Sequence, residues 1–196
     1  MSVITIILLS LAILTCVGIK LYVNAQWAKK PLHNFPFIYR GKEYWYSRSV
    51  AVTHFIFAKN ASDKWCVLAN QRGKGAESYQ GYWNCPCGYL DFDECGEEAA
   101  QRETFEETNV FIKKENIKFW NVISSPKAHR QNVSIHYYTV LDEKCEDFEL
   151  SNINAEKNEV KSLKWVAIDE KDEQKWAFNH SNHITEIFNS VITNNL

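Results

Sequence analysis

The sequence lacks an excess of charge of either sign. Its 196 residues include 22 lysines and arginines against 24 aspartates and glutamates, which gives a formal net charge of −2. Because a nucleic-acid surface normally shows a basic excess, the composition gives no electrostatic support for a nucleic-acid partner. Hydrophobic residues make up 45% of the chain, and a chain of this length can bury a proper core. We expect one domain with an appendage.

The six cysteines lack the paired C-x2-C spacing of a structural zinc site. Cys85, Cys87 and Cys95 are close enough in sequence to contribute three metal ligands, but no fourth ligand is evident nearby. Cys16 belongs to an apolar N-terminal run and leaves five cysteines elsewhere, an odd number that fits reduced thiols better than a disulfide framework. Cys85 and Cys87 are interpreted as small core-like residues, because no histidine stands at a fixed place to activate a cysteine nucleophile.

The first 23 residues lack charge except for Lys20. Because that lysine can snorkel, the usable apolar span reaches Val23, which is about 21 residues and enough to cross a bilayer. No basic side chain precedes the run. Basic residues follow at Lys20, Lys29, Lys30 and Arg40. The positive-inside rule therefore predicts a single-pass membrane anchor over residues 1–23 with the bulk of the chain in the cytoplasm.

Two alternatives to the anchor remain. A cleaved signal peptide is compatible with a cleavage site at Val23-Asn24-Ala25, although it lacks a basic n-region and has a long apolar region. A buried core helix would rarely be apolar so continuously. Residues 24–42 contain Pro31 and Pro36 without a clear period and are predicted to form a linker, so the domain is expected over residues 43–196.

The domain alternates extended and helical segments without internal repeats. Aromatic and β-branched residues predict strands at Tyr44–Ala58, Lys64–Arg72, Tyr82–Cys87, Phe119–Ile123, Asn132–Leu141 and Val160–Ile168. Helices are expected at Glu97–Thr108 and Asp172–Thr193, the second capped by Asp169 or Asp172. This order predicts an α/β sandwich around a mixed β-sheet.

Three glutamates share one face of the first predicted helix. Glu103, Glu106 and Glu107 have i, i+3 and i+4 spacing, which places their carboxylates within an arc of about 100°. An acidic solvated face is the ordinary interpretation of such a pattern. The like charges also repel, and a hard divalent cation with a preference for oxygen ligands would relieve that repulsion.

Fixed spacings around these glutamates favour a cation-binding site over an ordinary acidic face. Six positions follow the pattern G-x5-E-x7-R-E-U-x-E-E-x-G-U, in which U is apolar; they are Gly88, Glu94, Arg102, Glu103, Glu106 and Glu107. The probability of a chance match in a chain of this length is on the order of 10⁻⁵. The chain therefore resembles the Nudix hydrolases, in which this pattern is called the Nudix box. Two positions depart from the pattern: Thr104 replaces an apolar residue, and Asn109 replaces a glycine where a left-handed residue ends the helix.

The resemblance implies a Nudix-like α/β/α sandwich over about residues 40–190 and a hydrolase that uses Mg²⁺ or Mn²⁺. It implies that Glu103, Glu106 and Glu107 are catalytic metal ligands, joined by the backbone carbonyl of Cys87. Gly88 would allow a close backbone approach at the substrate, and the guanidinium of Arg102 would orient a glutamate. Such an enzyme cleaves the diphosphate linkage of nucleoside diphosphate derivatives.

Further candidates lie outside the box or beside the glutamates. Glu94 is expected to pair with Arg102, and Glu156 or Glu159 is a candidate for an additional acid. Arg72 and His129 are candidates for substrate binding, with Arg130 beside His129, whereas His180 and His183 are interpreted as surface or packing residues. Aromatic residues available to stack on a base are Trp45, Tyr79 and Trp83, although aromatics near a sheet are usually core.

The sequence predicts only a class of substrate, nucleoside diphosphate derivatives such as (d)NTPs or ADP-ribose. The signatures of NADH-cleaving and coenzyme A-cleaving relatives are absent. A non-catalytic nucleotide sensor is the main alternative, and the complete set of box glutamates argues against it. A diphosphate isomerase on the same scaffold is disfavoured because that group departs from the full box. The oligomeric state is not predicted.

Overall fold

The computed structural model describes residue 15, residues 34–156 and residues 158–193. The chain divides into two compact units, Met1–Ser47 and Arg48–Leu196. In the first unit, β1 (Phe35–Tyr39) and β2 (Lys42–Tyr46) form an antiparallel hairpin. The membrane anchor predicted for residues 1–23 lies outside the described residues, apart from Thr15. No helix in the described part of the chain is long and apolar enough to span a bilayer.

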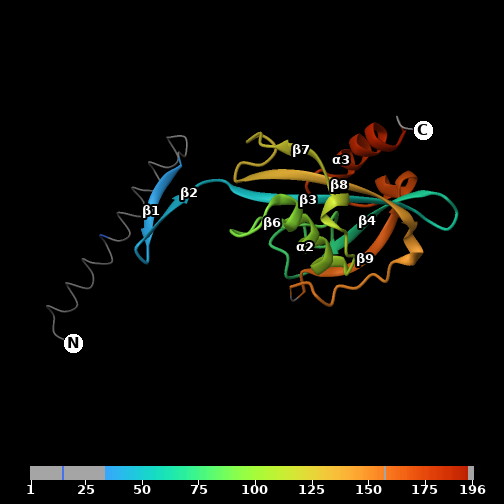
Figure 1. Ribbon diagram of the computed structural model, residues 1–196, viewed down its shortest axis with the longest axis horizontal. Coiled ribbons are helices and arrows are strands. Elements are labelled where there is room, and N and C mark those ends of the chain that lie inside the picture. The colour runs from blue at the N-terminus through green and yellow to red at the C-terminus, as the bar shows by residue number, and fades with distance from the viewer. Residues whose placement is uncertain (1–14, 16–33, 157, 194–196) are drawn as a thin grey trace. The chain divides into compact units, whose positions relative to one another are not determined.

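The described residues of the second unit form a seven-stranded mixed sheet (Figure 1). Its strands are β3 (Ser49–Lys59), β4 (Trp65–Arg72), β5 (Trp83–Asn84), β6 (Cys87–Tyr89), β7 (Lys118–Ile123), β8 (Asn132–Lys144) and β9 (Val160–Ala167). The long strands β3 and β8 pair in parallel at the centre, and every other pairing is antiparallel. Such a mixed sheet is what the sequence predicts.

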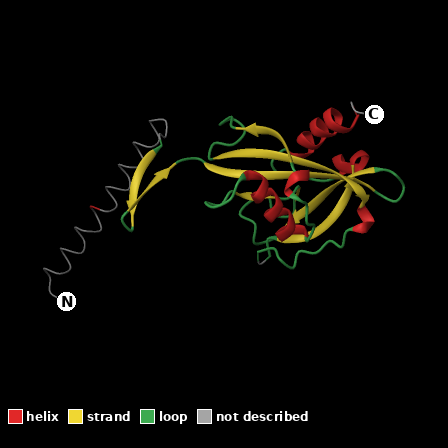
Figure 2. Cartoon of the chain, viewed as in Figure 1, coloured by secondary structure: helices red, strands yellow, loops and turns green. Residues whose placement is uncertain are grey.

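Alternate residues of β3 pack on opposite faces of the sheet, as a strand requires. Val52 and Ile56 pack with Ala99 and Ala100 of α2 (Gly96–Thr108). Phe55 and Phe57 pack in the other core, with isoleucines of α3 (His180–Ile187). The two helices therefore cover opposite faces of the sheet (Figure 2), which confirms the predicted layering of the mixed α/β fold.

Both ends of α2 follow from local sequence. The backbone N–H of Cys95 donates to Glu98 Oε2 at 2.9 Å, as in a capping box. At the other end Asn109 adopts the left-handed conformation at φ 62°, and its N–H bonds the Phe105 carbonyl at 2.8 Å. The expectation that Asn109 ends the helix is confirmed. Because both ends of the helix are fixed, the carboxylates on its last turns also have fixed positions along the sheet.

Thr104 has a polar partner that the sequence did not reveal. Its hydroxyl lies 2.9 Å from Nδ1 of His54, and it donates to the Ala100 carbonyl at 2.7 Å. His54 is fully buried, and its Nε2 lies 2.9 Å from the Thr139 hydroxyl. Burial lowers the pKa of His54 to about 3, so a neutral imidazole joins α2 to β3 and β8. The Thr104 hydroxyl therefore supplies this histidine with a partner that an apolar side chain would not provide.

Four predicted segments differ in the structure. The strand expected at Tyr82–Cys87 is two short strands, β5 and β6, separated by Cys85 and Pro86. The strand expected at Tyr44–Ala58 is two strands, β2 and β3, and the expected linker at 24–42 contains β1. The long helix expected at Asp172–Thr193 is wrong. It is divided into a 3-10 helix at Ile168–Glu173, the helix α3 and a π-helical turn at Phe188–Ile192. The cause is tertiary: Trp83 bonds the backbone of Lys175 and Ala177, which holds that stretch extended.

Candidate active site

Glu107 is the most deeply buried carboxylate of the acidic cluster on α2. Its side chain is 2% exposed, and its Oε2 accepts the backbone N–H of Cys87 at 3.0 Å. Burial, and after it the charge of Glu103, raises the pKa of Glu107 well above its usual value. The structure thus places the backbone of Cys87 beside Glu107, twenty residues away in sequence. Metal ligation through the Cys87 carbonyl stays a prediction.

Glu103 lies directly against the box glycine. A Cβ atom added to Gly88 would stand 2.1 Å from Glu103 Oε1, so glycine is required for the two chains to approach this closely. Burial raises the pKa of Glu103 to about 7, although the neighbouring Arg102 acts in the opposite direction. The partly buried carboxylate of Glu103 and the buried one of Glu107 therefore lie where α2 meets β6.

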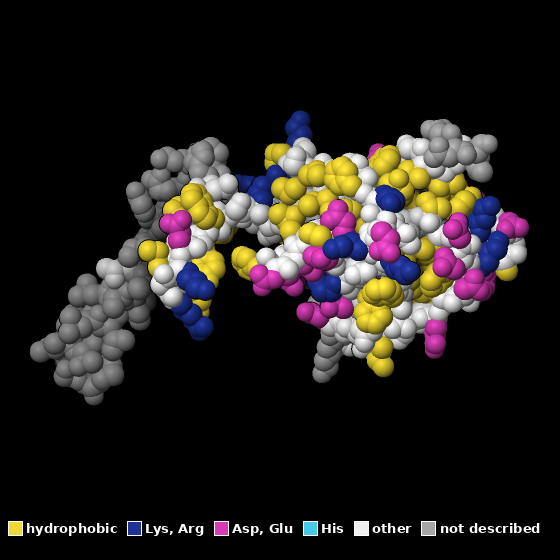
Figure 3. Space-filling view, viewed as in Figure 1, with side chains coloured by type: hydrophobic (Ala, Val, Ile, Leu, Met, Phe, Trp, Pro, Cys, Tyr) yellow, Lys and Arg dark blue, Asp and Glu magenta, His cyan; other side chains and the backbone are white. Residues whose placement is uncertain are grey.

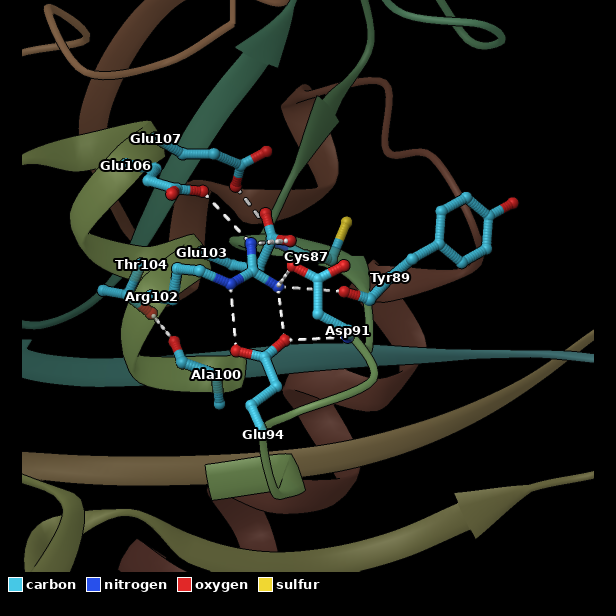
Figure 4. A network of polar contacts seen from close by, with 10 residues as sticks. All are labelled: Cys87, Tyr89, Asp91, Glu94, Ala100, Arg102, Glu103, Thr104, Glu106 and Glu107. Carbon is cyan, nitrogen blue, oxygen red and sulfur yellow. Dashed lines mark hydrogen bonds and ion pairs between the residues drawn. The ribbon is translucent and has the colours of Figure 1, made fainter. Parts of the chain in front are cut away.

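Arg102 connects the box carboxylates to one another (Figure 4). Its Nε and Nη2 donate to the two oxygens of Glu94, at 3.0 and 2.6 Å. Its Nη1 donates to Glu103 at 2.7 Å and to Glu106 at 3.1 Å. These bonds raise the pKa of the guanidinium and lower that of Glu94. The bidentate partner of Arg102 is thus Glu94, as expected for that pair, while Glu103 and Glu106 receive single bonds.

A cavity of about 1220 Å³ opens beside these carboxylates. Arg72, at the end of β4, lines it and is fixed by a 2.8 Å bond from Nε to the Ser78 carbonyl. Glu156 and Glu159 both line it as well. Burial raises the pKa of Glu159, and its charge contributes to the raised pKa values of Glu103 and Glu107. Of the two candidate acids outside the box, Glu159 is the one coupled to the buried carboxylates.

Histidines form a part of the cavity wall that the sequence analysis missed. The rings of His136 and His183 lie 4.7 Å apart between centroids, and both line the cavity. His180 also lines it, but is 2% exposed and accepts the Cys85 N–H at 3.0 Å, so it acts in packing as expected. Burial lowers the pKa of His136 to about 3. The alternation of β8, which places Ser134 and His136 on one face, was the available signal.

The predicted aromatic candidates are distributed between different environments. Tyr79 lines the cavity, with its ring centroid 4.9 Å from that of Phe178. Trp83 packs against the core, under the ammonium of Lys164. Trp45 belongs to the N-terminal hairpin. Among the three, Tyr79 is therefore the residue that the structure associates with the cavity.

The loop between β7 and β8 supplies another wall. Its His129 lines the cavity and accepts the Asn132 N–H on Nδ1 at 2.9 Å. The guanidinium of Arg48 bonds to the backbone of this loop. Nη1 donates to the Ser124 carbonyl and Nη2 to the His129 carbonyl, each at 2.6 Å, and Nη2 also donates to the Asn132 carbonyl. One guanidinium therefore bonds to backbone carbonyls at both ends of a cavity-lining loop.

Substitution of Arg48 by methionine is expected to raise KM about 5- to 20-fold with kcat nearly unchanged, because charge-assisted bonds that position the loop are lost. Steady-state kinetics measures both constants. Lys113→Met, which removes an exposed charge elsewhere, serves as the control and is expected to change neither. An unaltered KM in Arg48→Met would show that the loop does not depend on this anchor.

The carboxylates of α2 and the Cys87 carbonyl are the kinds of oxygen ligand that a hard divalent cation binds. Carboxylate oxygens and a backbone carbonyl are ligands preferred by Mg²⁺. Burial raises the pKa values of Glu103 and Glu107, and a bound cation would favour the charged forms of both. As placed, no three acidic, histidine or cysteine side chains converge on one point within the described residues. Arg102 holds Glu103 and Glu106, and binding a cation would require Glu106, which is 43% exposed, to turn away from it. The three cysteines that are close in sequence, Cys85, Cys87 and Cys95, also form no such group.

The sequence profile of the NUDIX domain matches residues 47–186, which is most of the chain. The chain belongs to the Nudix hydrolase family. The matched region includes the box, the cavity walls and α3, and it begins just after the N-terminal hairpin. The family assigned from six residues of the sequence is therefore confirmed over the whole second unit except its last few residues.

Solved structures share this fold at low sequence identity. The NUDIX domain of Shewanella oneidensis NrtR, crystallised with ADP ribose, is 19% identical with a TM-score of 0.62, covering 74% of this chain and 90% of that one. A MutT/nudix family protein from Enterococcus faecalis is 22% identical (TM-score 0.61), covering 88% and 69%. A bifunctional NMN adenylyltransferase/ADP ribose pyrophosphatase from Francisella tularensis, solved with AMP and a Mn ion, is 23% identical (TM-score 0.59), covering 87% and 46%. These likenesses show the fold alone.

Proposed function

We propose that this Nudix hydrolase is a Mg²⁺- or Mn²⁺-dependent pyrophosphohydrolase that cleaves the diphosphate linkage of nucleoside diphosphate derivatives such as (d)NTPs or ADP-ribose. The observation that carries the proposal is the pair of carboxylates with raised pKa values, the partly buried Glu103 and the buried Glu107, beside a cavity large enough for a nucleotide. A divalent cation there stabilises both carboxylates in their charged form. Glu106 is the third ligand and the Cys87 carbonyl a further one.

The residues around the carboxylates have separate tasks in this proposal. When bound, the cation neutralises phosphate oxygens and lowers the pKa of the attacking water. Arg102 keeps Glu103 and Glu106 oriented and is itself held by Glu94. Glu159 accepts the proton of the attacking water, for which its raised pKa suits it better than an exposed glutamate. Arg72 and His129 bind the phosphate groups from the cavity walls.

The substrate class rests on the cavity and on the ligands of similar folds. Two similar structures were solved with ADP ribose and with AMP bound. Tyr79 and Phe178 bring two aromatic rings to the cavity, with the guanidinium of Arg72 at 5.0 Å from the Phe178 ring centroid. Flat aromatic groups stack favourably on such side chains. We therefore place the nucleoside at Tyr79 and the diphosphate near the box.

We also propose that residues 1–23 anchor the enzyme as a single-pass membrane protein with this domain in the cytoplasm.

The test is turnover by the full-length chain in detergent, with Mg²⁺ and a panel of (d)NTPs and dinucleotide or sugar derivatives of nucleoside diphosphates. Products are separated and quantified as nucleoside monophosphate, phosphate and pyrophosphate. We expect activity that chelation abolishes and that Glu106→Gln lowers strongly. Nucleotide binding without turnover at any Mg²⁺ concentration would instead establish the sensor alternative.

A further inference from the structure

The β1–β2 hairpin presents a continuous aromatic face. Its register pairs Phe35 with Tyr46 and Phe37 with Tyr44, whose ring centroids lie 5.0 and 5.8 Å apart. Residues that oppose one another in an antiparallel pair, and those two positions apart on a strand, share a face. Tyr39, with its ring centroid 6.4 Å from that of Tyr44, extends the same row. Five aromatic rings therefore line one side of a twelve-residue hairpin.

Most of these large side chains are exposed to solvent, and so are residues on the opposite face. Phe37 is 45% exposed and Tyr39 54%, while Ile38 and Trp45 on the other face reach 77% and 60%. A two-stranded ribbon on its own is only marginally stable in water. Tyrosine and tryptophan, with an apolar ring and a polar edge, are enriched where a bilayer meets water. The hairpin has the composition of such an interface.

The turn of the hairpin is basic. Arg40 and Gly41 both adopt left-handed conformations, at φ 48° and 75°, as a tight two-residue hairpin turn requires. The Arg40 guanidinium lies 5.2 Å from the Tyr39 ring centroid, and Lys42 follows the turn. Figure 3 shows hydrophobic side chains over the hairpin and basic side chains at one end of it. Residues 24–47 contain four basic residues, Lys29, Lys30, Arg40 and Lys42, against the acidic Glu43. This charge suits an anionic surface.

The position of the hairpin in the chain selects the bilayer as its partner. Phe35 follows Val23, the end of the apolar run, by 12 residues, and 12 residues reach at most about 40 Å. If the apolar run spans a bilayer, the hairpin is held beside the membrane surface at a high effective concentration. Positive charge on the side that the positive-inside rule assigns to the cytoplasm matches the anionic leaflet found there.

We propose that the β1–β2 hairpin docks on the membrane surface, with its aromatic row Phe35, Phe37, Tyr39, Tyr44 and Tyr46 in the headgroup region and Arg40 and Lys42 on anionic lipid phosphates. The hairpin thereby acts as a second contact with the bilayer between the apolar run and the catalytic unit. The proposal rests on the membrane anchor proposed for residues 1–23 and does not depend on the catalytic activity proposed above.

The test uses the full-length chain reconstituted at one copy per nanodisc, in phosphatidylcholine alone or with added phosphatidylserine. Amide hydrogen exchange of Phe35–Tyr46 is measured by mass spectrometry. We expect exchange to slow by at least about fivefold when phosphatidylserine is present, and Arg40→Gln/Lys42→Gln to remove that difference. Lys113→Gln/Lys161→Gln, which removes the same charge from exposed positions of the catalytic unit, is expected to preserve it. Phe37→Ser/Tyr39→Ser is expected to speed exchange in both lipids.

Three results would overturn the proposal. The first is a full-length chain that does not associate with the nanodiscs. The second is hairpin exchange that is equal in both lipids and in detergent. The third is protection that appears only with two copies per disc, which would identify a second copy of the chain as the partner. None of the hairpin variants is expected to change turnover in detergent, so a failure of this proposal is distinguishable from a failure of the proposed activity.

Discussion

Replacing Glu107 with glutamine is expected to lower kcat by more than about 100-fold at saturating Mg²⁺. Loss of a group that merely supports a metal ligand already costs about 10- to 100-fold, and we assign Glu107 as a ligand. The substitution keeps the shape of the side chain and its acceptor for the Cys87 N–H, so the fold should persist. Turnover of the substrate identified in the panel is the measurement.

A second readout separates metal binding from catalysis. A cation that binds only the folded protein stabilises it by about 2.7 kcal/mol at a concentration 100 times its Kd. Thermal unfolding of the wild type should therefore shift upward with Mg²⁺ or Mn²⁺, and that of Glu107→Gln should not. Glu97→Gln, a substitution at the beginning of the same helix, is expected to retain both activity and the shift. Wild-type metal stabilisation in Glu107→Gln would refute its assignment as a ligand.

Arg102→Met is expected to lower the free energy of unfolding by about 2–3 kcal/mol. Removing one partner of a buried ion pair costs about 3–5 kcal/mol, and we take a smaller value because the Arg102 side chain is 28% exposed and its charge is partly screened. For a chain of this size the expected decrease in Tm is about 4–12 °C. Thermal or denaturant unfolding without metal measures it.

The cause is checked by a double-mutant cycle. Glu94→Gln combined with Arg102→Met should destabilise by less than the sum of the single changes, because no unpaired Glu94 charge is left. Lys114→Met, which breaks the exposed pair with Glu98, is the matched control and should destabilise far less than Arg102→Met, because exposed ion pairs contribute little. Additivity of the two changes would exclude the Glu94–Arg102 pair as the source.

The same pair predicts a dependence on pH. Arg102 holds the pKa of Glu94 below its usual range in the folded protein, so the stabilisation is present above the unfolded-state pKa of about 4.3. It is lost as the pH falls through the lower folded-state value. The difference in stability between the wild type and Arg102→Met should therefore shrink as the pH falls below about 4. A constant difference down to lower pH would contradict this linkage.

The sequence by itself determined the features that depend on local spacing. The box places three glutamates on one face of α2, Asn109 ends that helix, and Glu94 lies eight positions from its partner Arg102. The strands β4, β7, β8 and β9 also follow from alternation and β-branched content. These features involve residues within a few turns or one strand of each other, where helix and strand periodicity dictate neighbours.

The tertiary structure alone decided what faces the box. The parallel pairing of β3 with β8 places Thr53 opposite His136 across more than 80 positions of sequence, and this register brings a histidine to the cavity. The Trp83 backbone holds 175–177 extended, and so shortens the last helix. His54 meets Thr104 through the packing of α2 on β3. Periodicity specifies which face of an element is buried, but the partner on that face depends on strand order and register, which are set by the packing of the whole domain.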